Sequence, residues 1–325
     1  MEASPDTTPW PSEVTSILGG DVCVALAYRT PAGGVVLTPV TTIGMFDEGK
    51  GTVTTTSSFG NWKKLVRIAA DDRVALVYHA RDHGGASTPH LIVAQGRASF
   101  PDRPDGSWLT PDAAANIERF MPLPKSGRFW SWVGREYTEE RVPIVVSIHR
   151  ISVYDTPAAA EPSLVIGAPP ADEPAPAQRP PRNGTEPRVA AKRYAKRLAK
   201  TRHRLIGFTD TEGFPTARAA TFEHDGDSLI VDAPSLPPGG RRAGVLAHWF
   251  EPQLVGQGSV LLTGWLDVDA TTGTATYSPH TTSGYALPAS KLLFSFGGGL
   301  AAKFGYRKAI KAGHVRDGEW QRTTG

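Results

Sequence analysis

The stretch from Gly51 to Tyr78, GTVTTTSSFGNWKKLVRIAADDRVALVY, constrains the fold of this chain more than any other segment. Thr52–Thr56 alternates in a β-favouring run, and Ser57–Gly60 interrupts it. Asn61–Ala70 carries apolar residues at helical spacing, and Arg73–Tyr78 is a second β-rich run. The order therefore predicts a strand, a serine-rich turn, a short basic helix and a second strand.

Small hydroxyls and cations surround the turn that opens this predicted helix. The set is Ser57, Ser58, Lys63, Lys64 and Arg67. The unpaired N–H groups and the positive end of a helix favour an anion here, and a cofactor phosphate is the obvious candidate. Lys63 and Lys64 point about 100° apart on a helix, so we expect only one of them to reach the phosphate. The alternative is a solvated helix start with ordinary surface lysines.

The same stretch resembles the flavin-binding split barrels, that is, the pyridoxamine 5'-phosphate oxidase-like proteins and their deazaflavin-dependent relatives. A common pattern of that family is a run of small hydroxyls, a basic residue and then NL..dPRVAL. Its counterparts here are TTTSS, KKL and DDRVALVY. Val22–Phe46 resembles the preceding hairpin, and Leu91–Phe100 resembles the next strand, with Gly96 and Arg97 in the usual place. The resemblance implies a mainly β fold, the Greek-key split β-barrel, with a few helices.

The resemblance also implies which residues line the cofactor pocket. The second strand of the family lines the ring, and a glutamine on a later strand could hydrogen-bond the ring edge. Two threonines before the serine turn alternate faces, so one of them should face the site. The residues implicated are Pro39, Val40, Thr41, Thr55, Thr56 and Gln95. The alternatives are a core role for the second strand and simple exposure for the glutamine.

An aromatic-rich segment precedes the last strand of the first half. Gly127–Asp155 is predicted to form a helix and then a strand, an arrangement that family members often show. Trp130 or Trp132 could form a wall of the substrate pocket, because aromatic faces stack on planar ligands. The alternative is that these rings pack one end of the barrel.

A proline-rich segment from Asp155 to Pro187 divides the chain. Such a composition is typical of a semi-rigid or disordered linker. The 325 residues suffice for two domains, and 40% hydrophobic residues allow each domain a core. We therefore expect an N-terminal split barrel over residues 1–155, a linker over 156–187 and a C-terminal split barrel over 188–325.

The C-terminal half repeats the N-terminal half in outline. Arg204–Pro234 is predicted to form three strands joined by turns, and Ser259–Pro279 a hairpin through Thr272–Gly273. The site loop differs, because SLPPGGRRAGVL (Ser235–Leu246) stands where the first half has TTTSSFGNWKKL, with two arginines as candidates to replace the lysines. The family resemblance implies a dimer-like arrangement, with the flavin in a groove at the subunit interface. A tandem chain can therefore form a monomeric pseudo-dimer, with one good cofactor site, or pair further into a homodimer.

Two further features carry candidate functions. The basic segment Arg188–Arg204 is predicted to be helical. It could be a solvated face, a nucleic-acid contact or an attractor for the polyglutamate tail of coenzyme F-420. His280, in the sequence YSPHTTSGY, is the candidate proton donor or substrate ligand, because histidine titrates near neutrality. The alternative for His280 is a turn histidine that caps a backbone group.

Several motifs are excluded. GMFDEGKG (Gly44–Gly51) lacks the Ser or Thr of a phosphate loop and is interpreted as a hairpin turn. His79 and His83 follow a strand without an evident third ligand, so no metal site is expected there. Cys23 is the only cysteine, permits no intrachain disulfide and is interpreted as packing. Gly297–Gly299 is expected to mark a bend or a close approach.

Together these features predict an oxidoreductase that transfers a hydride between FMN or a deazaflavin, coenzyme F-420, and a small organic substrate. A composition rich in Ala, Arg, Gly and Pro favours the deazaflavin. The alternative is a non-catalytic binder of flavin, haem or another planar ligand in the same groove, and a third hypothesis is a nucleic-acid or partner-protein adaptor. The net charge of +3 does not favour nucleic acid, and no apolar run is long enough to cross a membrane. We therefore expect a cytoplasmic protein without a nucleic-acid or membrane partner.

Overall fold

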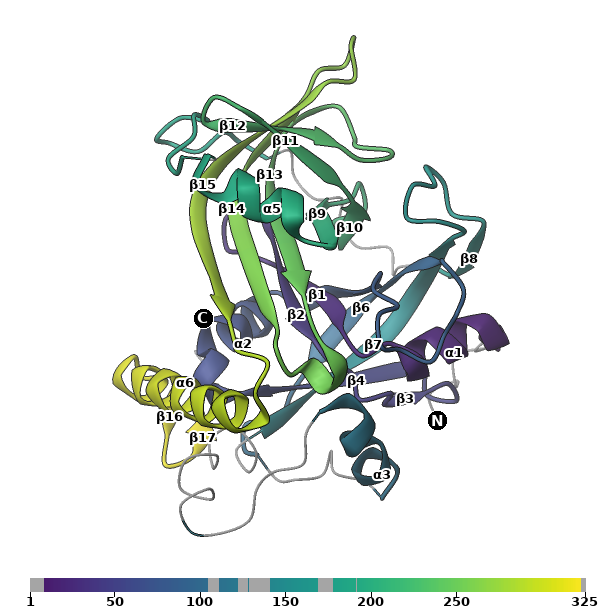
Figure 1. Ribbon diagram of the computed structural model, residues 1–325, viewed down its shortest axis with the longest axis vertical. Coiled ribbons are helices and arrows are strands. Elements are labelled where there is room, and N and C mark those ends of the chain that lie inside the picture. Colours follow the sequence, from purple (N-terminus) through teal and green to yellow (C-terminus); the bar gives the residue numbers. More distant parts are fainter. Residues whose placement is uncertain are drawn as a thin grey trace.

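The computed structural model describes residues 9–104, 111–121, 128, 141–168, 178–190 and 192–322. Eight strands of the first half form one antiparallel sheet in the order β2-β1-β5-β6-β7-β4-β3, with β8 paired to β7 (Figure 1). The strands are β1 (Val24–Arg29), β2 (Val35–Val40), β3 (Phe46–Asp47), β4 (Thr52–Ser58), β5 (Arg73–Tyr78), β6 (Leu91–Ser99), β7 (Arg141–Tyr154) and β8 (Leu164–Gly167). The helices are α1 (Ser12–Gly20), the 3₁₀ helix η1 (Phe59–Asn61), α2 (Trp62–Ala70) and α3 (Pro111–Phe120).

The second half forms a sheet of seven strands in the order β10-β9-β13-β14-β15-β12-β11. The strands are β9 (His203–Thr209), β10 (Pro215–Ala219), β11 (Thr221–Asp225), β12 (Ser228–Asp232), β13 (Gly239–Trp249), β14 (Gly258–Val268) and β15 (Ala275–Ala286). The helices are α5 (Lys192–Lys200), the 3₁₀ helix η2 (Pro252–Leu254) and α6 (Lys291–Lys311), and β16 (Val315–Arg316) pairs with β17 (Glu319–Trp320).

The two sheets have the same topology. Replacing β1–β7 by β9–β15 in the strand order of the first sheet gives the order of the second. The ladders agree in register, because Ala27 faces Leu37 in β1–β2 and Gly207 faces Ala217 in β9–β10. The expected pair of mainly β split barrels in one chain is therefore confirmed, whereas the domain boundaries stay a prediction.

A β-bulge recurs at the same place in both sheets. The register shifts between Gln95 and Gly96 in β6–β7, and between Thr263 and Gly264 in β14–β15. A Cβ at Gly96 would lie 1.9 Å from the carbonyl oxygen of Ser147, and one at Gly264 would lie 2.1 Å from that of Ser278. Both bulges therefore need glycine, and the pair fixes the alignment of the two copies.

The Gly51–Tyr78 stretch folds as predicted, with small shifts. The first strand extends through Ser58, and a 3₁₀ turn follows before α2 begins at Trp62. The side chain of Ser58 accepts a hydrogen bond from the N–H of Gly60 at 3.0 Å and so caps this turn. The hairpins through Gly44–Gly51 and Thr272–Gly273 are also present.

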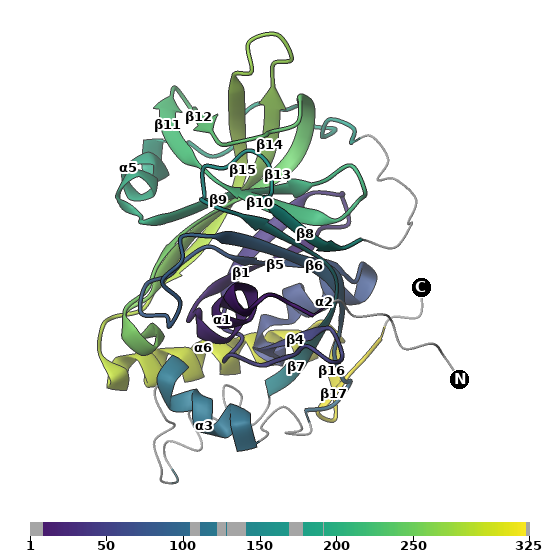
Figure 2. The same ribbon diagram turned by 90° about the vertical axis from the view of Figure 1, so that its right-hand side faces the viewer.

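Two segments differ from expectation. The proline-rich segment contains a strand, β8, which pairs with β7. Gly297–Gly299 lies inside α6 rather than at a bend. The C-terminal helix α6 runs beside the first half, where both views place it near α2 (Figures 1 and 2). A Cβ at Gly60 would lie 2.6 Å from the carbonyl oxygen of Ala302, so α6 touches the turn before α2.

The two halves share an apolar interface. Residues of both sheets form one buried cluster, which includes Leu37 from β2, Ala217 from β10 and Leu246 from β13. A Cβ at Gly207 would lie 2.9 Å from Cγ of Leu37, so that leucine packs directly on the backbone of β9. The sheets face each other across this layer (Figure 2). Among the described residues, no helix is both long and apolar enough to cross a membrane.

Candidate functional site

The hydroxyl residues of the predicted cofactor site, Thr55–Ser58, lie at the end of β4 and are buried; we call them the hydroxyl run. Thr55, Thr56, Ser57 and Ser58 are all less than 5% exposed. The hydroxyl of Thr55 donates to the carbonyl oxygen of Thr41 at 2.7 Å, so Thr55 is used internally. Ser57 differs from its neighbours, because its hydroxyl is buried and has no hydrogen-bond partner among the described residues. An unpaired buried hydroxyl is costly, and a bound ligand would remove that cost.

Two cations flank this hydroxyl run. The guanidinium of Arg141, on β7, donates to the hydroxyl of Thr56 at 2.6 and 2.9 Å. Lys64 on α2 is half-buried, whereas Lys63 is exposed, so the lysine pair diverges as the helical geometry requires. Desolvation, followed by the charge of Arg141, lowers the pKa of Lys64 to about 8. Arg67 turns toward the ring of Tyr28, 6.0 Å from its centroid.

No carboxylate pairs with Lys64 in the part of the chain that the structure describes, and Arg141 raises the cost of its charge. A buried cation is normally compensated by an anion. An ammonium from α2 and a guanidinium from β7 thus lie close together beside the hydroxyl run, and both are groups of the kind that bind a phosphate.

The C-terminal region of the chain covers this turn from outside. The ring of Phe59 lies 6.4 Å from that of Tyr306 in α6 and 5.7 Å from that of Trp320 in β17. A Cβ at Gly305 would lie 2.2 Å from the carbonyl oxygen of Gly60. The last segment of the second half therefore helps to keep water from the first half's candidate site.

The predicted ring pocket is mostly buried. On β2, Pro39 is half-buried and Val40 is 9% exposed. Thr41 follows β2 and accepts a hydrogen bond from the N–H of Ile43 on its hydroxyl at 3.2 Å. These residues lie at one end of the sheet with the hydroxyl run, since Thr55 binds the carbonyl of Thr41. Their role toward a ring stays a prediction.

Gln95 has a different environment from the one expected at a barrel edge. It is 2% exposed, and its amide donates to the carboxylate of Asp210 at 2.8 Å and to the carbonyl oxygen of Pro215 at 2.9 Å. Its carbonyl oxygen accepts from Arg150 at 2.8 Å, and Arg150 also pairs with Asp210 and Glu212. Gln95 therefore joins the two halves in this structure.

Three other predicted residues lie apart from the hydroxyl run or outside the described chain. His280 is half-buried on β15. Its Nε2 donates a hydrogen bond to the carbonyl oxygen of Thr185 at 3.2 Å. Desolvation is the main cause that lowers the pKa of His280. Trp130 and Trp132 lie outside the described residues.

The second half lacks the basic helix of the first. The ladders make Asp232, Ala233 and Pro234 the counterparts of Thr56, Ser57 and Ser58. Arg241 and Arg242 lie on β13, the counterpart of β5, so they do not take the place of the lysines of α2. The residues that correspond to Thr56–Ser58 therefore carry no hydroxyl, and no helix of the described chain stands between β12 and β13 to bring lysines beside them.

Three histidines form a cluster at the interface of the halves, which the sequence did not predict. His79 and His248 occupy equivalent positions at the ends of β5 and β13, and their Nε2 atoms lie 2.7 Å apart. His203 packs against both rings at 5.7 and 5.3 Å between centroids. Burial is the main cause that lowers the pKa of His79, to about 3, and it lowers that of His248 as well. Aligning the two copies by strand would have paired the first two histidines.

The partners of these histidines fix the direction of each hydrogen bond. Nδ1 of His79 lies 3.0 Å from the carbonyl oxygen of Val77, which can only accept, so Nδ1 carries the proton. Neutral His79 then accepts on Nε2, and His248 donates from its own Nε2. The remaining Nδ1 of His248 faces the thiol of Cys23 at 3.8 Å and accepts from it. Burial and then the charge of Asp21 raise the pKa of that thiol, which stays protonated.

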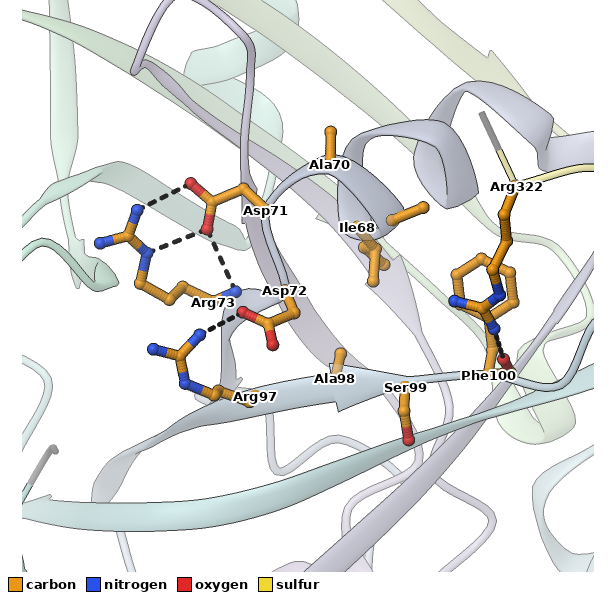
Figure 3. A pocket seen from close by; sticks show the side chains of 11 residues that line it. Ile68, Ala70, Asp71, Asp72, Arg73, Arg97, Ala98, Ser99, Phe100 and Arg322 are labelled. Atoms are coloured by element: carbon orange, nitrogen blue, oxygen red, sulfur yellow. Dashed lines mark hydrogen bonds and ion pairs between the residues drawn. The ribbon is translucent and has the colours of Figure 1, made fainter. Parts of the chain in front are cut away.

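A cavity of about 590 Å³ lies at the C-terminal end of α2 (Figure 3). Its charged groups pair with each other: Arg73 with Asp71 at 2.9 Å, and Arg97 with Asp72 at 2.5 Å. On another side of the cavity, Arg322 donates to the carbonyl oxygen of the adjacent Phe100 at 2.9 Å. It contains none of the predicted site residues, and its charges are already compensated.

No protein-family profile and no curated protein matches the chain. Among solved structures, an "F-420 reductase" is 19% identical, with a TM-score of 0.31, covering 45% of this chain and 98% of its own. A "pyridoxamine 5'-phosphate oxidase-related, FMN binding protein" from Nostoc punctiforme is 13% identical, with a TM-score of 0.32, covering 46% and 84%. A "heme binding protein" from Mycobacterium smegmatis is 13% identical, with a TM-score of 0.29, covering 92% and 100%. The resemblance to the split barrels is confirmed as one of fold, and likenesses at this level carry no argument about ligand or reaction.

Proposed function

We propose that this chain binds a flavin or deazaflavin through its phosphate at the turn between β4 and α2, and acts as an oxidoreductase on a small organic substrate. One observation carries the proposal. Lys64 is a half-buried cation beside a second cation, Arg141, whose guanidinium donates to the hydroxyl of Thr56 in the same hydroxyl run. A phosphate group would compensate the charge of Lys64 and accept charge-assisted hydrogen bonds from the ammonium and the guanidinium.

The residues present fit such a group at its phosphate end. Lys64 and Arg141 would hold the phosphate, and Ser57, whose buried hydroxyl has no partner among the described residues, stays a predicted ligand. The rings of Phe59 and Tyr306 restrict access of water to the same turn. The bound cofactor supplies the hydride chemistry, and the protein supplies binding, orientation and exclusion of water.

The first experiment compares FMN and coenzyme F-420 by titration, followed through the fluorescence of each. The wild type is expected to bind one of them. Lys64→Gln is expected to weaken binding about tenfold or more, because a charge-assisted hydrogen bond contributes about 1.5–3 kcal/mol. Lys63→Gln is the matched control, since Lys63 is exposed on the same turn of helix and its loss should change little. Equal weakening by both variants, or binding that neither changes, would contradict the proposed site.

A non-catalytic binder is the second candidate function, and one observation favours it. His280, the histidine expected to donate a proton, already bonds to the carbonyl oxygen of Thr185. Anaerobic mixing of the reduced, loaded protein with candidate acceptors separates the two functions. Oxidation that depends on an acceptor supports the enzyme, and a cofactor that stays reduced with every acceptor supports the binder.

A further inference from the structure

The second half contains an open cavity where the first half has its candidate cofactor site. Its volume is about 430 Å³, within the range of small-molecule pockets. By ladder register, its wall residues Ala219, Ala220 and Thr221 are the counterparts of Pro39, Val40 and Thr41. The remaining lining residues are His79, Pro157, Ala158, Arg202, His203, Arg204, Leu205, Asp232, Ala233 and Pro234. The serines and the basic helix of the first copy have no counterpart here, so this cavity does not suit a phosphate.

His203, in the wall of this cavity, is paired with Asp82, which lies behind it outside the lining. Nε2 of His203 is hydrogen-bonded to the carboxylate of Asp82, which also pairs with Arg202 at 2.8 Å. A carboxylate only accepts, so Nε2 of His203 carries the proton. In neutral His203 the lone pair is then on Nδ1, which makes no hydrogen bond with another described residue. The arrangement orients a basic nitrogen that no other described residue uses.

The groups packed around His203 keep it neutral and give it a fixed position. Its ring stacks on Phe250 at 5.7 Å between centroids, and His79 and His248 lie at 5.7 and 5.3 Å. Desolvation lowers the pKa of His203, and Arg202 acts in the same direction, while Asp82 opposes them. The other lining residues are small and apolar, apart from Arg204 beside His203 in β9, Thr221 and the exposed Asp232.

We propose that this cavity is a second ligand site, which takes a small organic acid with an apolar body. The carboxylate of the ligand hydrogen-bonds to Nδ1 of His203 and is compensated by Arg204, while its apolar body lies on the alanines and prolines of the wall. Because His203 is neutral before binding, the complex takes up one proton from solvent, which bridges the ligand and Nδ1. The site does not depend on the cofactor of the first half.

Calorimetric titration with benzoate tests the proposal, because benzoate combines a carboxylate with an apolar ring of suitable size. Titration in two buffers of different ionisation enthalpy should report uptake of about one proton per benzoate, and the affinity should fall about tenfold for each pH unit above neutrality. Benzamide, the uncharged analogue of the same shape, should bind at least about tenfold more weakly.

Three variants locate the site. His203→Asn should abolish the proton uptake, and Arg204→Gln should weaken benzoate binding without abolishing that uptake. Lys200→Gln is the control, since Lys200 is exposed on α5 and outside the cavity. Arg204→Gln keeps the test decisive if His203→Asn does not fold. No saturable binding of benzoate, binding that neither His203→Asn nor Arg204→Gln weakens, or binding without proton uptake would overturn the proposal.

Discussion

His79→Gln should remove a specific pH dependence from the stability of the protein. The ring of His79 is buried between the halves, and burial lowers its pKa from 6.5 to about 3. In the folded state the His79 ring therefore stays neutral, whereas in the unfolded state it takes up a proton as the pH falls below 6.5. The stability that depends on His79 is present above 6.5 and is lost progressively down to about pH 3.

The size of the effect follows from these two pKa values. Each pH unit below the unfolded value costs about 1.4 kcal/mol of unfolding free energy, so the loss near pH 5 is about 2 kcal/mol. Asp21 acts with the opposite sign, because burial raises its pKa to about 7 and stabilises the folded state as the pH falls through that value. The Asp21 contribution is common to wild type and variant, so it cancels in their difference.

The assay is urea denaturation at about pH 7.5 and about pH 5, with free energies obtained by linear extrapolation. His79→Gln lowers the stability at the higher pH, because it alters the contacts with Val77 and His248. The difference between wild type and variant should shrink by about 2 kcal/mol at the lower pH. His224→Gln is the control, since His224 is exposed on β11 and its loss should leave the difference constant. A wild-type-to-His79→Gln difference that is the same at both pH values would refute the reasoning.

Four further outcomes are expected. Gly96→Ala should lower the free energy of unfolding in urea by about 2 kcal/mol or more, because its Cβ would meet the carbonyl oxygen of Ser147 at 1.9 Å. Gly297→Ala should raise it by about 0.5–1 kcal/mol, since that Cβ would meet only Leu287 at 3.6 Å within a helix. Leu37→Ala, at the interface of the halves, should cost about 2–5 kcal/mol in the same assay. In fluorescence titrations, cofactor affinity should fall as the pH rises above about 8, the pKa of Lys64, because the ammonium then loses its charge. This pH dependence should be absent in Lys64→Gln.

Much of the fold could be predicted from the sequence, because its local signals agree with the tertiary structure. The alternation of Thr52–Thr56, the helical spacing after Asn61 and the β-rich run Arg73–Tyr78 each correspond to an observed element. The bend offered for Gly297–Gly299 does not occur, because helix α6 continues through these glycines. Packing outweighed local propensity there, since the same helix lies against the turn at Gly60.

The site was less accessible to sequence reasoning. The hydroxyl run and the lysines could be named, because they stand together in the chain. Arg141 could not, because it reaches Thr56 only through the pairing of β7 with β4. The same holds for Asp82 and His203, which are 121 positions apart and meet only where the halves join. Contacts of this kind depend on strand register across the whole sheet, which no short motif records.

The hydrogen bond between His79 and His248 breaks the pseudo-two-fold symmetry of the two halves. A two-fold axis cannot pass through a directional hydrogen bond, because one nitrogen must donate and the other must accept. Two identical subunits would therefore share the proton between two equivalent arrangements. In this chain Cys23 stands opposite one histidine, and His203 occupies the equivalent position in the other half. Because the two copies belong to one chain, the positions on either side of the pseudo-two-fold axis can differ, and these differences determine which histidine donates the proton.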